Sequence, residues 1–423
     1  MDNRIDLEEL LDVAITLGYR LLMCGAEISR VEEAIQRLLR AYGTTGDVFA
    51  IPNCLIVTLC PDGTAPITRM RRIGPHGTDI DGVERFYSLA RRLCAEKPKP
   101  KEAHAMLRET KRTSATYSFP MQIAAYFIAA SAFAVFFGAN LPGGVLAGIA
   151  GVLTGLWLRA LDRLQVNPFF QTITASFFIG IYSQALTHFG LILYADATAI
   201  GALMLLVPGM KITDSMRDVI YGDTLSGVNK LMQVFLTTAA LLLGTGTALL
   251  LSRALWHTAS VGISLDVPYP WWIQVTAAAF SCLGFCLLYN IRTFGMFICM
   301  AGGALGWGVY LAAGRFGATG LLCNFLAAAA ISLYAEIMAR IRKFPSFSYL
   351  VIALLPLVPG AGVYYTVEYL LQEDASMSLR QGTQTAAIAG LLAVGIMMVS
   401  SVFRMIGVAK QQMREKHANR RRT

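Results

Sequence analysis

The order of apolar and polar positions divides this chain into two parts near residue 116. Before it, apolar residues recur at helical or alternating spacing among many charged ones, as in a water-soluble domain. From Tyr117 onward, apolar segments of about 20 residues, the length that crosses a bilayer as a helix, follow one another. We therefore expect an α-helical integral membrane protein with a soluble N-terminal domain at residues 1–115.

The soluble part predicts a small α+β domain. A helix over 10–22 is followed by a second helix with one apolar stripe, formed by Ile28, Val31, Ile35, Leu38 and Leu39. Three short β-rich runs follow at 48–51, 55–59 and 67–73, and Pro61-Asp62-Gly63 predicts a hairpin turn between the last two. Residues 81–94 return to helical spacing. The basic stretch from Lys97 is expected to be the linker to the membrane part.

The rest of the chain predicts ten membrane-spanning helices in two sets of five. The first set lies at 118–137, 142–161, 168–188, 190–208 and 228–251. The second set lies at 271–289, 293–313, 317–339, 347–367 and 382–405. We expect the two sets to form separate membrane domains, at 116–255 and 268–407, followed by a basic cytoplasmic tail at 408–423.

One tetrapeptide occurs once in each set. Leu206-Val207-Pro208-Gly209 recurs 151 residues later as Leu357-Val358-Pro359-Gly360, and an acidic residue follows each copy at the same offset, Asp223 or Asp374. Such a match indicates duplication. Because five spans is an odd number, the second copy must cross the membrane in the opposite sense. The pattern predicts two inverted five-helix repeats, each with a helix broken at its proline and glycine.

Composition agrees with membrane insertion, and the basic residues predict its orientation. Hydrophobic residues make up 55% of the 423-residue chain and charged residues 15%, whereas about a quarter charged is usual for a soluble protein. With the N-terminus inside, nine basic residues fall in cytoplasmic loops and three in outer loops, as the positive-inside rule requires. The nine are Arg159, Arg163, Lys211, Arg217, Lys230, Arg292, Arg340, Arg342 and Lys343, and the three are Arg253, Arg315 and Arg380.

Both termini are then cytoplasmic, and the segments after the two motifs face opposite sides of the membrane. We expect a cytoplasmic loop with Lys211 and Arg217 after the first motif, and an outer loop with Glu368, Glu373 and Asp374 after the second. The opposite charge of the two loops agrees with this assignment.

Charge and cysteine content limit the partners. The net charge of +9 is concentrated at 97–112 and 410–422, and beside membrane spans such runs favour contact with anionic lipid over nucleic acid. The eight cysteines have no zinc or haem spacing, so we expect no metal or cofactor, and a soluble domain that faces a reducing cytoplasm. The polar start, Met1 to Glu9, predicts no signal peptide. A homo-oligomer is compatible with these observations.

The two motifs are the first candidates for substrate binding. Broken helices free backbone groups that must find protein, water or substrate partners in lipid, so we expect Pro208-Gly209 and Pro359-Gly360 to hold a polar substrate. The alternative is an ordinary kink. Uncharged polar residues of the third and eighth spans join the substrate site in this prediction: Thr174, Ser176 and Asn324. Ser183 and Gln184 belong to the same polar set, and such residues also serve as contacts between helices.

Ionisable residues within spans are the candidates for proton coupling or gating, because charge in hydrocarbon is costly. Asp196 and Glu336 lie near span ends, and Glu336 has Arg340 four residues on as a ready ion-pair partner. A polar cluster after the first motif completes the set: Asp214, Arg217, Asp218 and Asp223. The alternative for this cluster is a solvated loop.

The competing interpretation is a membrane-anchored enzyme, in which the soluble domain is catalytic and the spans serve only as an anchor. A hydrolase needs a nucleophile beside a base, yet the chain contains neither GxSxG nor HExxH. Two five-helix sets are also far more membrane than an anchor needs.

Several segments resemble one known family. Gly25-Ala26-Glu27, Phe49-Ala50-Ile51-Pro52 and Gly77-Thr78-Asp79 resemble the soluble module of the threonine/serine exporter (ThrE) family. The stretch from Leu205 to Asp223 resembles that family's first membrane half, and the segment around Leu357 to Gly360 is similar to the small subunit of its two-part bacterial form (YjjP with YjjB).

The resemblance implies a bacterial inner-membrane secondary exporter of threonine and serine, driven by the proton motive force. The two-part relatives are associated with succinate export, so export of a small dicarboxylate is the alternative. The family's soluble module has been likened to hydrolases, but this sequence contains no set of catalytic residues that would support such an activity.

Overall fold

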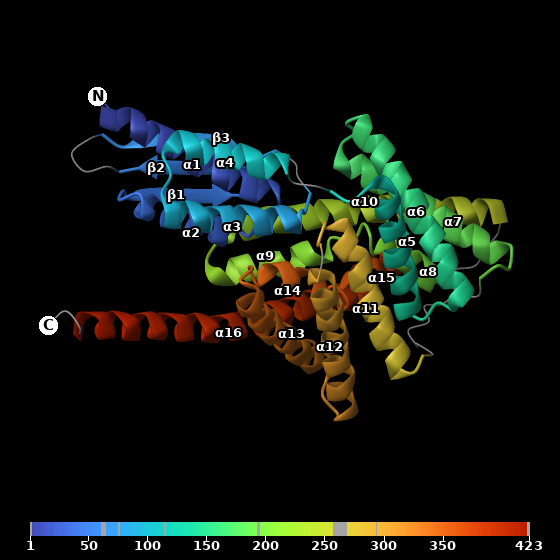
Figure 1. Cartoon of the computed structure of the whole chain (residues 1–423). Helices are drawn as coiled ribbons and strands as arrows, with labels where there is room; N and C mark the ends of the chain where they lie inside the picture. The colour runs from blue at the N-terminus through green and yellow to red at the C-terminus, as the bar shows by residue number, and fades with distance from the viewer. Residues whose placement is uncertain are drawn as a thin grey trace. The chain divides into compact units, whose positions relative to one another are not determined.

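The computed structural model describes residues 2–60, 65–74, 77–113, 116–192, 195–256, 269–292 and 294–420. It divides into two compact units. Unit 1 comprises Met1–Ser118 with Leu287–Thr293, and unit 2 comprises Phe119–Cys286 with Phe294–Thr423. Figure 1 labels the elements of both.

The described residues of unit 1 form four helices and one antiparallel sheet. Its elements are α1 (Asp2–Met23), α2 (Ile28–Ala41), β1 (Gly46–Ile51), β2 (Cys54–Leu59), β3 (Ile67–Arg72), α3 (Ile80–Glu96) and α4 (Pro100–Arg112). The strands lie in the order β1-β2-β3. The apolar stripe of α2 is buried together with Leu17 of α1 and Leu55 of β2, because each element presents one apolar face to a shared core. The expected α+β order is confirmed; the turn at Pro61-Asp62-Gly63 lies outside the described residues.

The linker expected after Lys97 is instead the helix α4. Pro100 occupies its first turn, where a missing N–H costs nothing, and Ala103 and Leu107, four residues apart, are buried against the rest of unit 1. The basic residues of the segment lie on the remaining surface of this amphipathic helix. Because they are so numerous, the helical spacing of the two buried apolar residues was not recognised in the sequence.

A second chain segment completes unit 1. Asn290 Nδ2 donates to Asp79 Oδ1 at 2.8 Å, and the backbone N–H of Ile80 donates to the Tyr289 carbonyl at 2.9 Å. The Tyr117 hydroxyl donates to the Ile291 carbonyl at 2.9 Å. The start of α3 and the segment before unit 2 are therefore both tied to residues 289–291.

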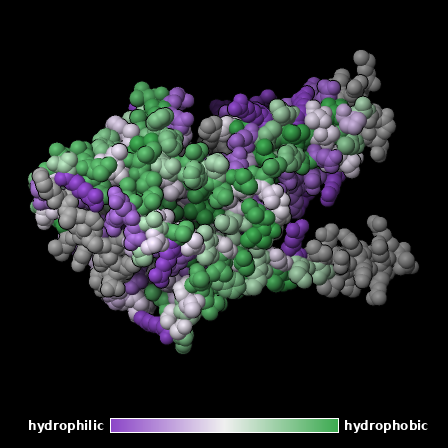
Figure 2. All heavy atoms as spheres, turned by 180° about the vertical axis from the view of Figure 1, so that it is seen from behind, coloured by the Kyte–Doolittle hydropathy of each residue, from purple (hydrophilic) through white to green (hydrophobic). Residues whose placement is uncertain are grey.

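Unit 2 is entirely helical in its described part. Its helices are α5 (Phe119–Phe136), α6 (Leu141–Arg163), α7 (Pro168–His188), α8 (Ala195–Leu203), α9 (Gly209–Tyr221), α10 (Thr224–Trp256), α11 (Trp271–Leu288), α12 (Gly295–Arg315), α13 (Gly320–Arg342), α14 (Phe347–Ala353), α15 (Gly360–Leu371) and α16 (Ala375–Arg420). Among the described residues, seven helices are long and apolar enough to cross a membrane: α5, α6, α10, α11, α12, α13 and α16. Figure 2 shows the broad hydrophobic surface that they present.

Three of the ten expected spans differ from that set. The predicted span 168–188 is the helix α7, whose polar side chains, Gln171 and Gln184 among them, lower its hydropathy. The predicted spans 190–208 and 347–367 are not continuous helices. Each is split at its tetrapeptide, into α8 and α9 and into α14 and α15. Lys211, Arg217 and Glu368, which were expected in loops, are therefore helical, whereas Glu373 and Asp374 lie in the connection between α15 and α16.

The two halves of unit 2 share one order of elements: three helices, a split helix and a long final helix. Within each half, the final helix packs on the third helix and on the second part of the split helix, as α10 does on α7 and α9, and α16 on α13 and α15. Between the halves, α9 packs on α16 and α10 on α15 (Figure 1). In both contacts, the second part of one half's split helix packs on the final helix of the other half.

Glycines allow the helices within each half to approach closely. A Cβ on Gly151 of α6 would lie 2.6 Å from the Tyr126 carbonyl oxygen of α5. A Cβ on Gly306 of α12 would overlap the Ile331 side chain of α13. Helix packing in lipid depends on small residues at such points.

Candidate functional site

The two split helices break in the same way. Pro208 has φ −81° and ψ 36° before α9, and Pro359 has φ −76° and ψ 48° before α15. The backbone angles of both prolines lie outside the helical range. The Pro208 carbonyl accepts the first hydrogen bond of α9, from Ile212 N at 3.3 Å, and the Pro359 carbonyl accepts that of α15, from Val363 N at 3.2 Å. The expected breaks at both motifs are present, at matching residues.

The two breaks are packed against each other. A Cβ on Gly209 would overlap Val358 Cγ1 and lie 3.9 Å from Gly360 Cα. A Cβ on Gly360 would lie 2.7 Å from Met204 Sδ and 3.2 Å from Val207 Cγ1. Only glycine fits at either position without displacement of a neighbour. The motifs, 151 residues apart in sequence, therefore form one crossing point, with Pro208, Gly209, Pro359 and Gly360 all buried.

A cavity of about 50 Å³ lies between the split helices and their neighbours. Its lining comprises Gly180, Ser183 and Gln184 of α7, Asp196, Ala199 and Leu203 of α8, Thr245 and Leu249 of α10, and Tyr364, Val367, Glu368 and Leu371 of α15. Asp196 comes from the first half and Glu368 from the second. We call this place the acidic cavity.

The acidic cavity contains polar atoms that lack partners among the described residues. Ser183 is 1% exposed, and its Oγ has no hydrogen-bond partner there; neither has the buried Oε2 of Glu368. Glu368 Oε1 accepts a long bond, 3.4 Å, from Gln372 Nε2, and the Tyr364 hydroxyl is a further hydrogen-bonding neighbour of this carboxylate. No lysine or arginine occurs among the described lining residues. The cavity thus offers two carboxylates and a hydroxyl, and no cation of its own.

Sequence reasoning placed Glu368 in an outer loop, and that placement is wrong. The helix α15 continues to Leu371, so Glu368 lies on it one turn after Tyr364. Since residues 364, 367, 368 and 371 share one helical face, the spacing after Gly360 was the signal that could have identified this face. Asp196, in contrast, was a predicted site residue, and Ser183 and Gln184 belonged to the predicted polar set.

The polar cluster after the first motif forms a buried ion network. Asp214 Oδ1 lies 3.4 Å from Arg217 Nη2, and Lys230 Nζ of α10 lies 2.6 Å from Asp218 Oδ2, which also accepts from Ser226 Oγ at 2.9 Å. Arg217 and Asp218 are 5% and 8% exposed, so a solvated loop is excluded for them. The network joins α9 to α10. The Arg217 guanidinium lies 5.9 Å from the centre of the Phe347 ring of α14, in the other half.

The repeated acidic residues, Asp223 and Asp374, begin the final helices. The Asp223 carbonyl accepts from Gly227 N at 2.9 Å, and the Asp374 carbonyl accepts from Ser378 N at 3.0 Å. The Asp374 carboxylate also accepts from Met377 N at 3.0 Å and Ser376 Oγ at 2.8 Å. The bond from the Met377 backbone N–H, followed by the bond from the Ser376 hydroxyl, lowers the pKa of Asp374 below its usual value. Asp223 is exposed and lies outside the acidic cavity.

The other predicted residues are satisfied locally. Thr174 accepts from Trp157 Nε1 at 3.0 Å, Ser176 donates to the Thr172 carbonyl at 2.8 Å, and Asn324 donates to the Gly320 carbonyl at 2.8 Å. Glu336 pairs with Arg340 and accepts from Ser346 Oγ at 2.9 Å. None of these four lines the acidic cavity.

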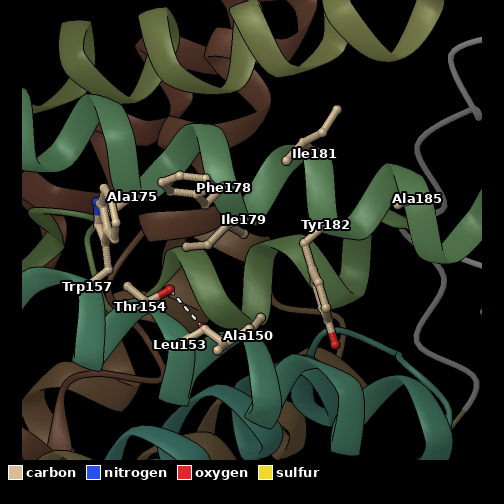
Figure 3. Close-up of a pocket in the computed structure, with 10 residues that line it drawn as sticks. All are labelled: Ala150, Leu153, Thr154, Trp157, Ala175, Phe178, Ile179, Ile181, Tyr182 and Ala185. Atoms are coloured by element: carbon tan, nitrogen blue, oxygen red, sulfur yellow. Dashed lines mark hydrogen bonds between the residues drawn. The ribbon is translucent and has the colours of Figure 1, made fainter. Parts of the chain in front are cut away.

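A larger cavity, about 470 Å³, lies between α6 and α7 (Figure 3). Its lining carries no charged side chain and comprises Ala150, Leu153, Thr154, Trp157, Ala175, Phe178, Ile179, Ile181, Tyr182 and Ala185. The Thr154 hydroxyl donates a hydrogen bond to the Ala150 carbonyl at 2.8 Å. Such walls suit lipid chains rather than a charged solute. Among the residues that the structure describes, no group of three or more His, Cys, Asp or Glu side chains could hold a metal ion.

Comparisons with known proteins match nearly the whole chain. Residues 12–252 match a family described as "Putative threonine/serine exporter", and residues 274–402 match one described as "Threonine/Serine exporter, ThrE". The "Probable threonine/serine exporter" of Mycobacterium tuberculosis (strain ATCC 25618 / H37Rv) is 26% identical over 416 residues, which cover 92% of this chain and 75% of that protein. The "Threonine/serine exporter" of Corynebacterium glutamicum is 22% identical over 404 residues, covering 92% and 81%. No solved structure matches the chain.

Proposed function

Because this chain belongs to the threonine/serine exporter family, we propose that it exports threonine and serine across the bacterial inner membrane, coupled to the proton gradient. Family membership makes it a transporter and not an enzyme, and its seven apolar helices make it a multi-pass membrane protein. The hydrolase alternative is therefore dropped.

One observation carries the mechanism: the two split helices cross at their proline-glycine breaks. In this proposal the halves are inverted repeats, and alternating access arises when one half rocks against the other about the crossing. The equivalent exchanged contacts, α9 with α16 and α10 with α15, support a symmetric pair of states. The basic residues that the positive-inside rule assigns to the inner side support termini that both lie in the cytoplasm.

The substrate's chemistry fits the surroundings of the crossing. The first backbone N–H groups of α9 and α15 carry partial positive charge, which suits an amino acid's carboxylate. The carboxylates of Asp196 and Glu368 suit its ammonium group. Two carboxylates and no cation repel a dicarboxylate, so the acidic cavity favours an amino acid over succinate. Asp214, Arg217, Asp218 and Lys230 form a gate between α9 and α10. Thr174 joins α7 to α6 through Trp157, whereas Ser176 and Asn324 bond within their own helices.

Glycine substitutions at the crossing test this mechanism. Gly209→Ala forces a methyl group into Val358, which is stiff because it is β-branched, so threonine efflux from proteoliposomes should fall by about tenfold or more. Gly360→Ala meets Met204, a flexible side chain, and should be milder. Shortening the opposing residue, in Gly209→Ala with Val358→Ala, should restore efflux.

Gly308→Ala is the matched control, since a Cβ there meets nothing within 4 Å. Its efflux should equal that of the unaltered protein. Protein yield and thermal unfolding in detergent separate a transport defect from misfolding. If Gly209→Ala transports as well as Gly308→Ala, or if Val358→Ala fails to restore a folded Gly209→Ala protein, the crossing is not the pivot.

A further inference from the structure

We propose that Asp196 and Glu368 together form a single cation site, which a proton and the ammonium group of the substrate occupy in turn. This inference rests on the proposed function and specifies which groups couple the proton to the amino acid. It assigns to Glu368 a role that the sequence did not indicate.

The charge balance of the acidic cavity carries the first step. Asp196 and Glu368 face one cavity, neither forms an ion pair with a described lysine or arginine, and Glu368 Oε2 is buried without a described partner. Two unpaired carboxylates in so small a space repel each other and lose hydration, so an empty site is costly. A bound cation removes most of that cost.

The groups around the pair supply no competing charge. On α15, Tyr364 and Tyr365 are the ionisable neighbours of the carboxylates, and both are neutral when protonated. The described lining from α7 and α10 is uncharged: Gly180, Ser183, Gln184, Thr245 and Leu249. Any charge that stabilises the pair must therefore come from a ligand.

The size of the cavity limits that ligand. A volume of about 50 Å³ holds a water molecule or an ammonium group but not an entire amino acid. Ser183, buried and without a described partner, offers a hydroxyl at the wall beside the carboxylates. The acidic cavity therefore binds the charged amine end of the substrate, and the rest of the molecule extends toward the crossing.

The origin of the two carboxylates links cation binding to movement. Asp196 lies on α8 of the first half and Glu368 on α15 of the second, so any rocking of the halves changes their separation. After the ammonium group has left on the outer side, a proton from outside neutralises one carboxylate and returns with the substrate-free carrier. One proton moves inward for each ammonium group that moves outward, and the site never carries both.

Two transport modes of one proteoliposome preparation test this. In threonine–threonine exchange, the carrier crosses the membrane in both directions with the substrate's ammonium group bound. In accumulation driven by a pH gradient, the carrier must return with a proton bound instead. Glu368→Gln and Asp196→Asn should each abolish gradient-driven accumulation while exchange persists. The KM of exchange should rise by about tenfold, because each variant loses one hydrogen bond between a carboxylate and the charged ammonium group. Acidification on the substrate side should inhibit exchange competitively in the unaltered protein.

Glu373→Gln is the control, because Glu373 is an exposed acid five residues after Glu368. It should accumulate threonine as the unaltered protein does. The proposal is overturned if Glu368→Gln still accumulates threonine along the pH gradient, or if exchange and accumulation fall together. If the unaltered protein moves no threonine in either mode, the proposed function itself is wrong.

Discussion

Glu336 and Glu368 are both acidic residues on helices of the second half, and their neighbours give them different roles. Glu336 is paired with Arg340 and accepts a bond from Ser346 Oγ, so its charge is balanced within the protein. Glu368 faces Asp196 across the acidic cavity without a basic residue in the described lining. A balanced carboxylate stabilises the fold, whereas an unbalanced one remains available to a ligand.

Cys24 shows the same influence of surroundings in unit 1. Burial, with the nearby carboxylates of Asp79 and Asp81, raises the pKa of Cys24 to about 12. Because the thiolate is the nucleophile, iodoacetamide should leave Cys24 of the folded protein almost unmodified at pH 8. Peptide mapping by mass spectrometry measures this, with the urea-unfolded protein as the control. Rapid alkylation of Cys24 without unfolding would contradict the burial.

At the scale of elements, local patterns were predictable and long-range partners were not. The stripe of α2 and the breaks at Pro208 and Pro359 follow from residue spacing and from proline chemistry, which act within one turn. The helix α4 was missed because only the packing of Ala103 and Leu107 distinguishes it from a charged linker. Glu368 was missed because the acidic cavity brings α15 of the second half against α7, α8 and α10 of the first half, which lie far from it in sequence.

The ion pair between α9 and α10 gives a prediction at this scale. Asp218→Asn leaves Lys230 largely buried without its counter-charge, which should cost about 3 kcal/mol of unfolding free energy. Adding Lys230→Met removes the stranded charge and should recover part of the loss. Thermal unfolding of the purified protein in detergent reports both changes. Equal and additive losses from the two single substitutions would show that the residues do not interact.

At the scale of the whole membrane unit, the two halves contact each other through equivalent elements. Beyond the crossing of the motifs, Gly284 of α11 allows close packing on α5, where a Cβ would lie 2.5 Å from Ala129 N. In this account, such small residues let helices of the two halves approach closely, and the halves rock against each other at these contacts. The acidic cavity adjoins the same boundary, so the substrate site and the moving surface coincide in this account.

The most direct measurement of the central claim is transport by the purified chain in liposomes under an imposed pH gradient. Labelled threonine should move against its gradient with saturable kinetics, compete with serine but not succinate, and stop when a protonophore collapses the gradient. Movement of succinate instead of threonine would contradict the substrate assignment. Threonine flux that neither saturates nor responds to the protonophore would indicate a passive channel and contradict the carrier mechanism.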